Sequence, residues 1–183
     1  MKKLLFLEGE RVLIRPPKIS DVPNIQKNAK SLKDPQSRVL TQRAESFVRR
    51  ARYELKKHRR FTFVIDLKGS EKAIGVVELY KVDYKNKNAA LGYWLGKKYR
   101  GKGIMSEAVL SILKFGFKRL KLHRIYAKVL EDNAASRRVL EKCGFTYEGT
   151  AREARLVGKI FKNEQLFAIL KEDFERQNKL SRT

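Results

Sequence analysis

The sequence predicts an α+β fold with a mixed, mostly antiparallel central sheet. Alternating apolar runs and amphipathic stretches follow one another along its 183 residues. A strand, a glycine-containing turn, a long helix and a second strand succeed one another over 89–130. This order predicts a right-handed crossover, which places one parallel strand pair inside an antiparallel sheet. The length suits one core, so we predict a single domain over 1–183 with a charged tail at 171–183.

The chain opens with a short predicted strand and a helix. Residues 11–15 alternate between polar and apolar side chains, as a half-buried strand does. Pro16 and Pro17 end this strand because proline has no N–H to donate to a ladder. Apolar residues at helical spacing then predict a helix over 21–29 that covers the strand.

A basic helix and a β-hairpin follow. Residues 31–40 read as a loop, and an apolar stripe at helical spacing predicts a helix over 42–58. Branched and aromatic residues fill 60–67 and 73–80, which are joined by a short polar turn. Two such runs around a glycine-containing turn predict a hairpin.

The second half of the chain continues the alternation. Strands are predicted at 89–95 and 124–130, with a helix from 104 to about 120 between them. A short helix over 134–142 follows. The last strands are expected at 145–154 and 160–170, and we expect the tail from 171 to be a helical or frayed end.

Composition restricts the partners. The net charge of +23 attracts polyanions and repels cationic substrates, so partners should be anionic overall. A single cysteine, Cys143, and two distant histidines offer neither a disulfide nor zinc-ligand spacing, so we expect no metal site. The apolar run 4–7 is shorter than the ~7 to 15 residues of a signal peptide core. We expect a cytoplasmic protein without membrane contact.

Cations crowd the predicted helix at 42–58 and the turn after it. They are Arg49, Arg50, Arg52, Lys56, Lys57, Arg59 and Arg60. One interpretation is a solvated surface face. The other is a face that docks on RNA or the ribosome, because neutralising phosphates releases counterions. A high content of Lys, Arg and Glu also fits thermal adaptation without any partner.

The turn at 96–106 has the features of a phosphate cradle. Gly101 and Gly103 lack the β-carbons that would keep a polyanion from the backbone, and the following helix N-terminus favours negative charge. Arg100 and Lys102 add countercharge. The segment also matches most of a nucleotide-triphosphate P-loop, but Gly103 stands where a magnesium-binding Ser or Thr belongs. We therefore disfavour ATP or GTP hydrolysis, while a purely structural turn remains an alternative.

Three motifs resemble the GNAT acyltransferases, in particular the branch of RimJ/RimL-type ribosomal-protein N-terminal acetyltransferases. The motifs are Leu91-Gly92-Tyr93-Trp94-Leu95, the loop Arg100-Gly101-Lys102-Gly103-Ile104-Met105-Ser106-Glu107-Ala108, and the segment Asn133–Phe145. The resemblance covers roughly 10–170. It implies a sheet that splays between the strands at 89–95 and 124–130, helices on both faces, and acetyl-CoA as donor with coenzyme A as product.

The same resemblance implies the cofactor contacts. The pyrophosphate would lie on the backbone amides of Gly101, Lys102, Gly103, Ile104, Met105 and Ser106. The backbone of Tyr93 and Leu95 would bind pantetheine, because splayed strands leave peptide groups unpaired. Asn133 and Ser136 would bond along the pantetheine arm, and Arg137 would reach a phosphate of the nucleotide end. For Asn133 the alternative is a helix N-cap.

The sequence departs from the family pattern at two catalytic positions. Ala90 stands where relatives often have glutamate, and Leu140 stands where many members have the tyrosine acid. Ser136 is therefore the expected acid. Glu78 is our first candidate base, with a solvent-facing strand residue as the alternative, and the weaker candidates are Asp83, Glu131 and Glu164. We expect Cys143 to be a packed small residue rather than a nucleophile.

The resemblance favours the α-amino group of a protein or peptide N-terminus as acceptor, with a ribosomal protein as the leading example. The amine would attack the thioester directly in a ternary complex. Two alternatives stay open: a small-amine N-acetyltransferase that acts on a polyamine or aminoglycoside, and a basic RNA- or ribosome-binding module without turnover. A monomer and a homodimer are both compatible with the sequence.

Overall fold

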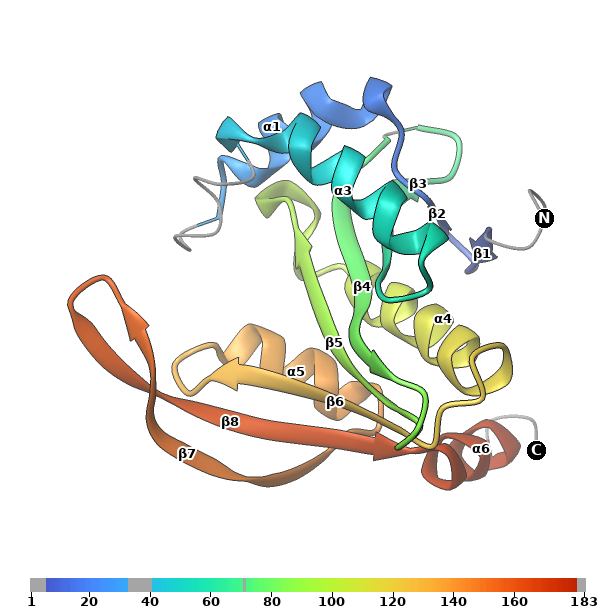
Figure 1. Cartoon of the computed structure of the whole chain (residues 1–183), viewed down its shortest axis with the longest axis vertical. Helices are drawn as coiled ribbons and strands as arrows, with labels where there is room; N and C mark the ends of the chain where they lie inside the picture. Colours follow the sequence, from blue (N-terminus) through green and yellow to red (C-terminus); the bar gives the residue numbers. More distant parts are fainter. Residues whose placement is uncertain (1–5, 33–40, 71, 181–183) are drawn as a thin grey trace.

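A computed structural model of the chain describes residues 6–32, 41–70 and 72–180. Within this part, eight strands form one sheet in the order β1-β2-β3-β4-β5-β6-β8-β7. Neighbouring strands are antiparallel except β5 and β6, which are parallel (Figure 1). The predicted mixed, mostly antiparallel sheet is confirmed.

The elements lie close to the predicted ranges. The strands are β1 (Leu7–Glu8), β2 (Val12–Arg15), β3 (Phe61–Leu67), β4 (Gly75–Asp83), β5 (Asn88–Leu95), β6 (Arg124–Leu130), β7 (Thr146–Val157) and β8 (Ile160–Leu170). The helices are α1 (Val22–Ala29), α3 (Ala44–Lys56), α4 (Ile104–Lys118), α5 (Ala134–Lys142) and α6 (Lys171–Leu180), with short 3-10 turns at Ile19–Asp21 and Lys97–Tyr99.

Two differences from the prediction have local causes. β1 is only two residues long, too short for a periodic pattern. β7 continues to Val157 because its pairing with β8 resumes after an irregularity between Ala151 and Arg155. The beginning of the tail is helical, which is one of the two forms expected for it, and Phe174 packs on Phe117 with ring centroids 5.3 Å apart. Most of the predicted loop at 31–40 lies outside the described residues.

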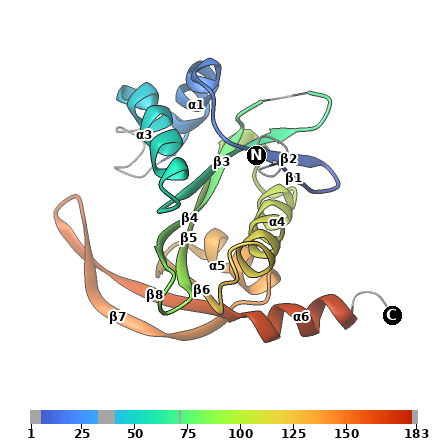
Figure 2. The ribbon, with the colours of Figure 1, turned by 45° about the vertical axis from the view of Figure 1, so that its right-hand side comes forward.

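Helices cover both faces of the sheet, as predicted. Figure 2 shows α1 and α3 on one side of the central strands and α4 on the other. The buried side of α3, with Val48 and Ala51, faces a small core that includes Val64 and Val76. The apolar side of α4 enters the main core. No helix among the described residues has the length and apolar composition needed to cross a membrane.

The sheet forks between β5 and β6. Their pairing is limited to residues 88–90 of β5 with 124–126 of β6. Beyond Ala90 and Tyr126 the two strands separate, and β6 pairs along its whole length with β8 instead. The predicted splay is therefore confirmed, and the curved β7–β8 hairpin extends away from α1 and α3 below the fork (Figure 1).

A buried ion-pair network joins the first strands to the helical layer. Arg15 on β2 donates to Asp66 on β3 at 2.7 Å and to Asp21 at 2.8 Å. The Asp66 carboxylate also accepts the amide of Ala73 at 2.8 Å. All three charged side chains are less than a tenth exposed. The network therefore holds β2, β3 and the start of α1 in one arrangement.

The network keeps Asp21 ionised in spite of its burial. Burial raises the pKa of this carboxyl, but hydrogen bonds from Arg15 and from the Lys18 amide lower it more, so its pKa lies below the usual value. A carboxyl with a lowered folded-state pKa stabilises the fold above its unfolded pKa of about 3.9. We expect this stabilisation to be lost as the pH falls below the unfolded pKa and through the lower pKa of the folded state.

Replacing Arg15 tests the network. We expect Arg15→Met to lower the free energy of unfolding by about 3 kcal/mol, because it leaves two buried carboxylates without their cation. Urea unfolding at pH 7 measures the loss. Arg49→Met is the matched control, since Arg49 pairs with Glu45 on the exposed side of α3, and its effect should stay within ~0.5 kcal/mol. Equal effects of the two substitutions would contradict the role of the network.

Candidate active site

The glycine turn presents unpaired backbone amides at the start of α4. Gly101 and Gly103 have φ angles of 75° and 76°, and Gly103 is the N-cap. The first intrahelical bond joins the Glu107 amide to the Gly103 carbonyl, so the amides of Ile104 to Ser106 precede the helical ladder. A β-carbon built on Gly101 would meet no atom within 4 Å. The turn is therefore open on the side of Gly101 and suits an anion.

Hydrogen bonds that the sequence did not predict connect this turn and the start of α4 to Arg11 and Val12. Glu107 in the first turn of α4 accepts the backbone amides of Arg11 at 2.6 Å and Val12 at 3.2 Å. The Arg11 guanidinium bonds Glu107 at 3.0 Å and the Lys102 carbonyl at 3.0 Å. Burial by itself would raise the pKa of the Glu107 carboxyl, but the hydrogen bonds from Arg11 and Val12 have the larger effect, so its pKa lies below the usual value. No local pattern could reveal partners 96 residues apart.

The backbone of β5 faces the fork at Tyr93 and Leu95. The Gly96 amide bonds the Ile74 carbonyl on the β4 side. Because successive peptide groups of a strand point to opposite sides, those of Tyr93 and Leu95 point toward the gap beside β6. Arg100 donates its Nε to the Leu95 carbonyl at 2.9 Å, so this side chain braces the end of β5.

Helix α5 closes the other side of the fork. Asn133 is its N-cap, and its Oδ1 accepts the Ser136 amide at 3.1 Å, so the cap interpretation is confirmed. The Tyr93 hydroxyl donates to the Ser136 carbonyl at 3.1 Å and ties β5 to α5. Burial raises the pKa of Tyr93, which keeps this hydroxyl protonated. Arg137 is exposed, and its Nε lies 3.7 Å from Oε1 of Glu141 on the same helix.

The face of the sheet opposite α4 carries Glu78. The register places Glu78 across from Gly92, and Tyr80 across from Ala90 at the fork. Arg60 holds Glu78 with bonds of 2.8 and 3.0 Å, and Thr62 adds a third of 2.7 Å. The Glu78 side chain is 14% exposed, so it is not a freely solvated strand residue.

The weaker candidate bases are Asp83, Glu131 and Glu164, and of these only Glu164 is buried. Asp83 is half-buried, and its carboxylate accepts the backbone amide of Asn86, which lowers its pKa. Glu131 is exposed and accepts Asn163. Glu164 is buried beside Arg155 and shares the Glu78 face of the sheet. Its burial in the assembled sheet could not be inferred from the alternation of β8 alone.

Cys143 is a packed residue, as predicted. It is fully buried, and its thiol contacts the Ser106 carbonyl at 3.5 Å. Burial raises the pKa of the thiol to about 12, so it stays protonated at neutral pH and is not a ready nucleophile.

Residues 11–146 match the family described as the acetyltransferase (GNAT) domain. The chain belongs to the GNAT acetyltransferase family. It is therefore an acetyl-CoA-dependent N-acetyltransferase, as its forked sheet and glycine turn led us to expect.

Curated GNAT relatives are similar over about half to two thirds of their lengths. Probable N-acetyltransferase YjcK of Bacillus subtilis is 40% identical over 123 residues, which cover 67% of this chain and 68% of YjcK. The ribosomal-protein-serine acetyltransferase of Escherichia coli is 30% identical, covering 54% and 55% of the two chains. The spermidine N(1)-acetyltransferase of Vibrio cholerae is 28% identical, covering 55% and 58%.

Solved structures agree with the GNAT fold. Mycobacterium smegmatis RimJ, solved in complex with CoA-disulfide, superposes with a TM-score of 0.83 at 24% sequence identity. The match covers 97% of this chain and 95% of RimJ. At this identity the likeness shows the fold, including the forked sheet.

A matched pair of glycine substitutions tests the turn. Gly101 and Gly69 have φ angles of 75° and 74°, and a β-carbon on either would meet no atom within 4 Å. Replacing either glycine by aspartate should therefore lower the free energy of unfolding by about 1 kcal/mol, because a side chain strains this backbone conformation. We expect only Gly101→Asp to weaken coenzyme A binding, by at least about tenfold, because it brings a negative charge to the anion-binding amides. Calorimetric titration measures this, and equal affinities for the two variants would contradict the assignment.

Proposed function

We propose that this enzyme acetylates the N-terminal α-amino group of a protein, with a ribosomal protein as the leading example, by direct transfer in a ternary complex. The main supporting observation is the open face of the fork, where Glu78 is anchored beside Gly92 and Ala90. The similarity to a ribosomal-protein-serine acetyltransferase supports the same acceptor class. We further propose one domain over 1–183 and a cytoplasmic location.

Acetyl-CoA supplies the thioester carbonyl when bound, and the residues around the fork fit it. We assign the pyrophosphate to the amides of 101–106, with Arg100 and Lys102 contributing positive charge. The Tyr93 and Leu95 peptide groups would bind the pantetheine amides. The Leu95 amide would also stabilise the developing oxyanion. Asn133 and Ser136 would lie along the pantetheine arm, with Arg137 at the nucleotide end.

Glu78 is the proposed base. An ionised carboxylate has about four acceptor positions, and Arg60 and Thr62 occupy three of them in the structure. The remaining position is available to a water or to the acceptor amine. Glu78 would take the proton of the attacking amine, directly or through water. The Ser136 hydroxyl, held by the bonds that fix its backbone, would return a proton to the leaving thiolate.

Charge favours a peptide over a small polyamine. The Glu78 face also carries cationic side chains at Arg60, Lys128 and Arg155, and the chain has a net charge of +23. A spermidine molecule would bring several positive charges into this field, whereas a protein N-terminus brings one. Small-amine acetylation remains the alternative that the spermidine acetyltransferase relative represents.

The outer face of α3 supports a second role, contact with ribosomal RNA. Arg50, Arg52 and Lys56 are exposed, and none forms an ion pair with another described residue. Tyr53 is 56% exposed between them, where it could stack on a base. The opposite side of α3 is anchored in the small core. We propose that this face holds the enzyme near its acceptor by electrostatic attraction.

A peptide panel tests the function. The purified protein is incubated with acetyl-CoA and peptides that begin with Ala, Ser, Met or Gly, and with spermidine. We expect thiol release with the peptides and a single acetyl group on the α-amine by mass spectrometry. Turnover of spermidine alone would replace the proposed function with the small-amine alternative. No turnover with any amine, together with RNA binding, would favour the binding module.

Glu78→Gln tests the base. We expect kcat to fall about 100-fold, because the amide cannot accept a proton, while KM for acetyl-CoA and the unfolding free energy change little. Thr62→Val is the control, since it removes one bond to the carboxylate and keeps the group itself. A kcat within threefold of wild type for Glu78→Gln would contradict the assignment.

Removing cations from α3 tests the RNA contact. We expect Arg50→Ala/Arg52→Ala/Lys56→Ala to reduce the slope of log affinity against log salt for an rRNA fragment by about 2. The triple variant Lys114→Ala/Lys118→Ala/Arg119→Ala removes three exposed cations at the other side of the sheet and should leave the slope closer to wild type. Equal slopes for the two variants would show that only net charge matters.

A further inference from the structure

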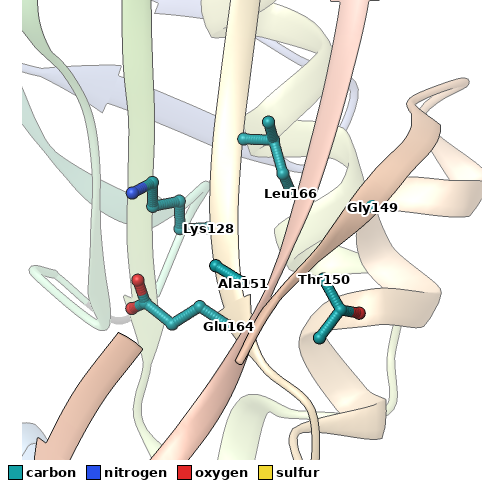
Figure 3. Close-up of a pocket in the computed structure, with 6 residues that line it drawn as sticks. All are labelled: Lys128, Gly149, Thr150, Ala151, Glu164 and Leu166. Carbon is teal, nitrogen blue, oxygen red and sulfur yellow. The ribbon is translucent and has the colours of Figure 1, made fainter. Parts of the chain in front are cut away.

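A cavity lies beyond the fork, on the same face of the sheet as Glu78. It has a volume of about 260 Å³ and is lined by Lys128, Gly149, Thr150, Ala151, Glu164 and Leu166. Figure 3 shows the side chains of Lys128 and Glu164 extending to the same side of the sheet, whereas Thr150 extends to the other. We call this hollow the β7 trough, after the strand that contributes half of its lining.

The register connects the β7 trough to the proposed reaction centre. Tyr126 lies beside Ala90 at the last paired position of the fork. Lys128 is two residues further along β6 and therefore points to the same face. Tyr80 of β4 also lies beside Ala90 on this face. The trough and Glu78 thus lie on the same face of the sheet, on the two sides of the fork.

The trough is shaped for a short side chain. Its floor consists of Gly149, Ala151 and the apolar Leu166, and the pairing of β7 is irregular on both sides of Gly149 to Ala151. A β-carbon on Gly149 would meet no atom within 4 Å. Two small residues on the floor leave room beside Leu166 that a serine, alanine or threonine side chain would fill.

The trough also carries an excess of positive charge. Glu164 is 9% exposed and bonds Arg155 at 3.1 Å, so this carboxylate is already neutralised. Lys128 is exposed and takes part in none of the ion pairs among the described residues. Arg155, which is not part of the lining, balances Glu164, so Lys128 contributes the excess positive charge of the trough, which favours an acceptor that brings a carboxylate.

We propose that the β7 trough receives the first residues of the acceptor peptide and selects a small first residue followed by an acidic one, through Ala151 and Lys128 respectively. This inference rests on the proposed function. In it the reactive amine lies at the fork, the first side chain lies over Ala151 and Leu166, and the second side chain pairs with Lys128.

A charge reversal tests Lys128. The acceptors are peptides that differ only at the second position, with Ser-Glu or Ser-Lys at the N-terminus. We expect the wild type to prefer the glutamate peptide about fivefold in kcat/KM and Lys128→Glu to prefer the lysine peptide. Lys118→Glu makes the same change in net charge on the exposed side of α4 and should keep the wild-type preference. Identical preferences for the two variants would overturn the role of Lys128.

Filling the floor tests Ala151. We expect Ala151→Leu to lower kcat/KM about tenfold for a serine peptide relative to a glycine peptide, because the added atoms occupy the space of the first side chain. Ala154→Leu places the same residue in the same strand outside the trough and should not change this ratio. KM for acetyl-CoA should stay constant in both variants, which shows that the fold and the donor site are intact.

The outcomes separate this inference from the proposed function. A wild type that acetylates no peptide α-amine overturns the proposed function and the peptide role of the trough together. A wild type that acetylates peptides, with Lys128→Glu and Ala151→Leu behaving like their matched controls, leaves the function standing and overturns the trough alone.

Discussion

The early end of the β5–β6 pairing is the constraint on which the rest of the structure depends. Three residues of each strand pair, and the strands then separate, so the peptide groups of Tyr93 and Leu95 face a gap rather than a neighbouring strand. Buried peptide groups need hydrogen-bond partners. In the proposed site the amide groups of the pantetheine arm would meet this need. One carbonyl, that of Leu95, is already satisfied by Arg100.

The glycine turn depends on contacts from distant parts of the chain. Positive φ angles at Gly101 and Gly103 expose the amides, but the start of β2 determines where they point, through Arg11 and Glu107. The Tyr93 hydroxyl gives α5 a comparable attachment to β5. Two hydrogen-bonded joints, Arg11–Glu107 and Tyr93–Ser136, thus connect separate elements at the proposed donor site, and each restricts motion where the cofactor is expected to bind.

The two faces of the sheet have different chemistry. The face of α4 and α5 offers backbone amides and helix N-termini, which suit phosphates and peptide groups. The opposite face carries the Arg60–Glu78 pair, the Arg155–Glu164 pair and two tyrosines, Tyr80 and Tyr126. The ion pairs fix the positions of Glu78 and Glu164 on this face, as recognition of an amine requires.

The sequence by itself determined the order of the main elements, the crossover with its glycine turn and the resemblance to the family, because all of these are encoded in residues close together along the chain. It offered the Asn133 cap only as an alternative, which the structure confirmed. Periodicity also showed which residues of a strand share a face. Only the tertiary structure decided where β5 and β6 part, that Arg11 braces Glu107, that Arg60 holds Glu78, and that Glu164 is buried beside Lys128 in a trough. These features depend on which strands meet and at what register, and a pattern within one segment carries no information about its partner's register.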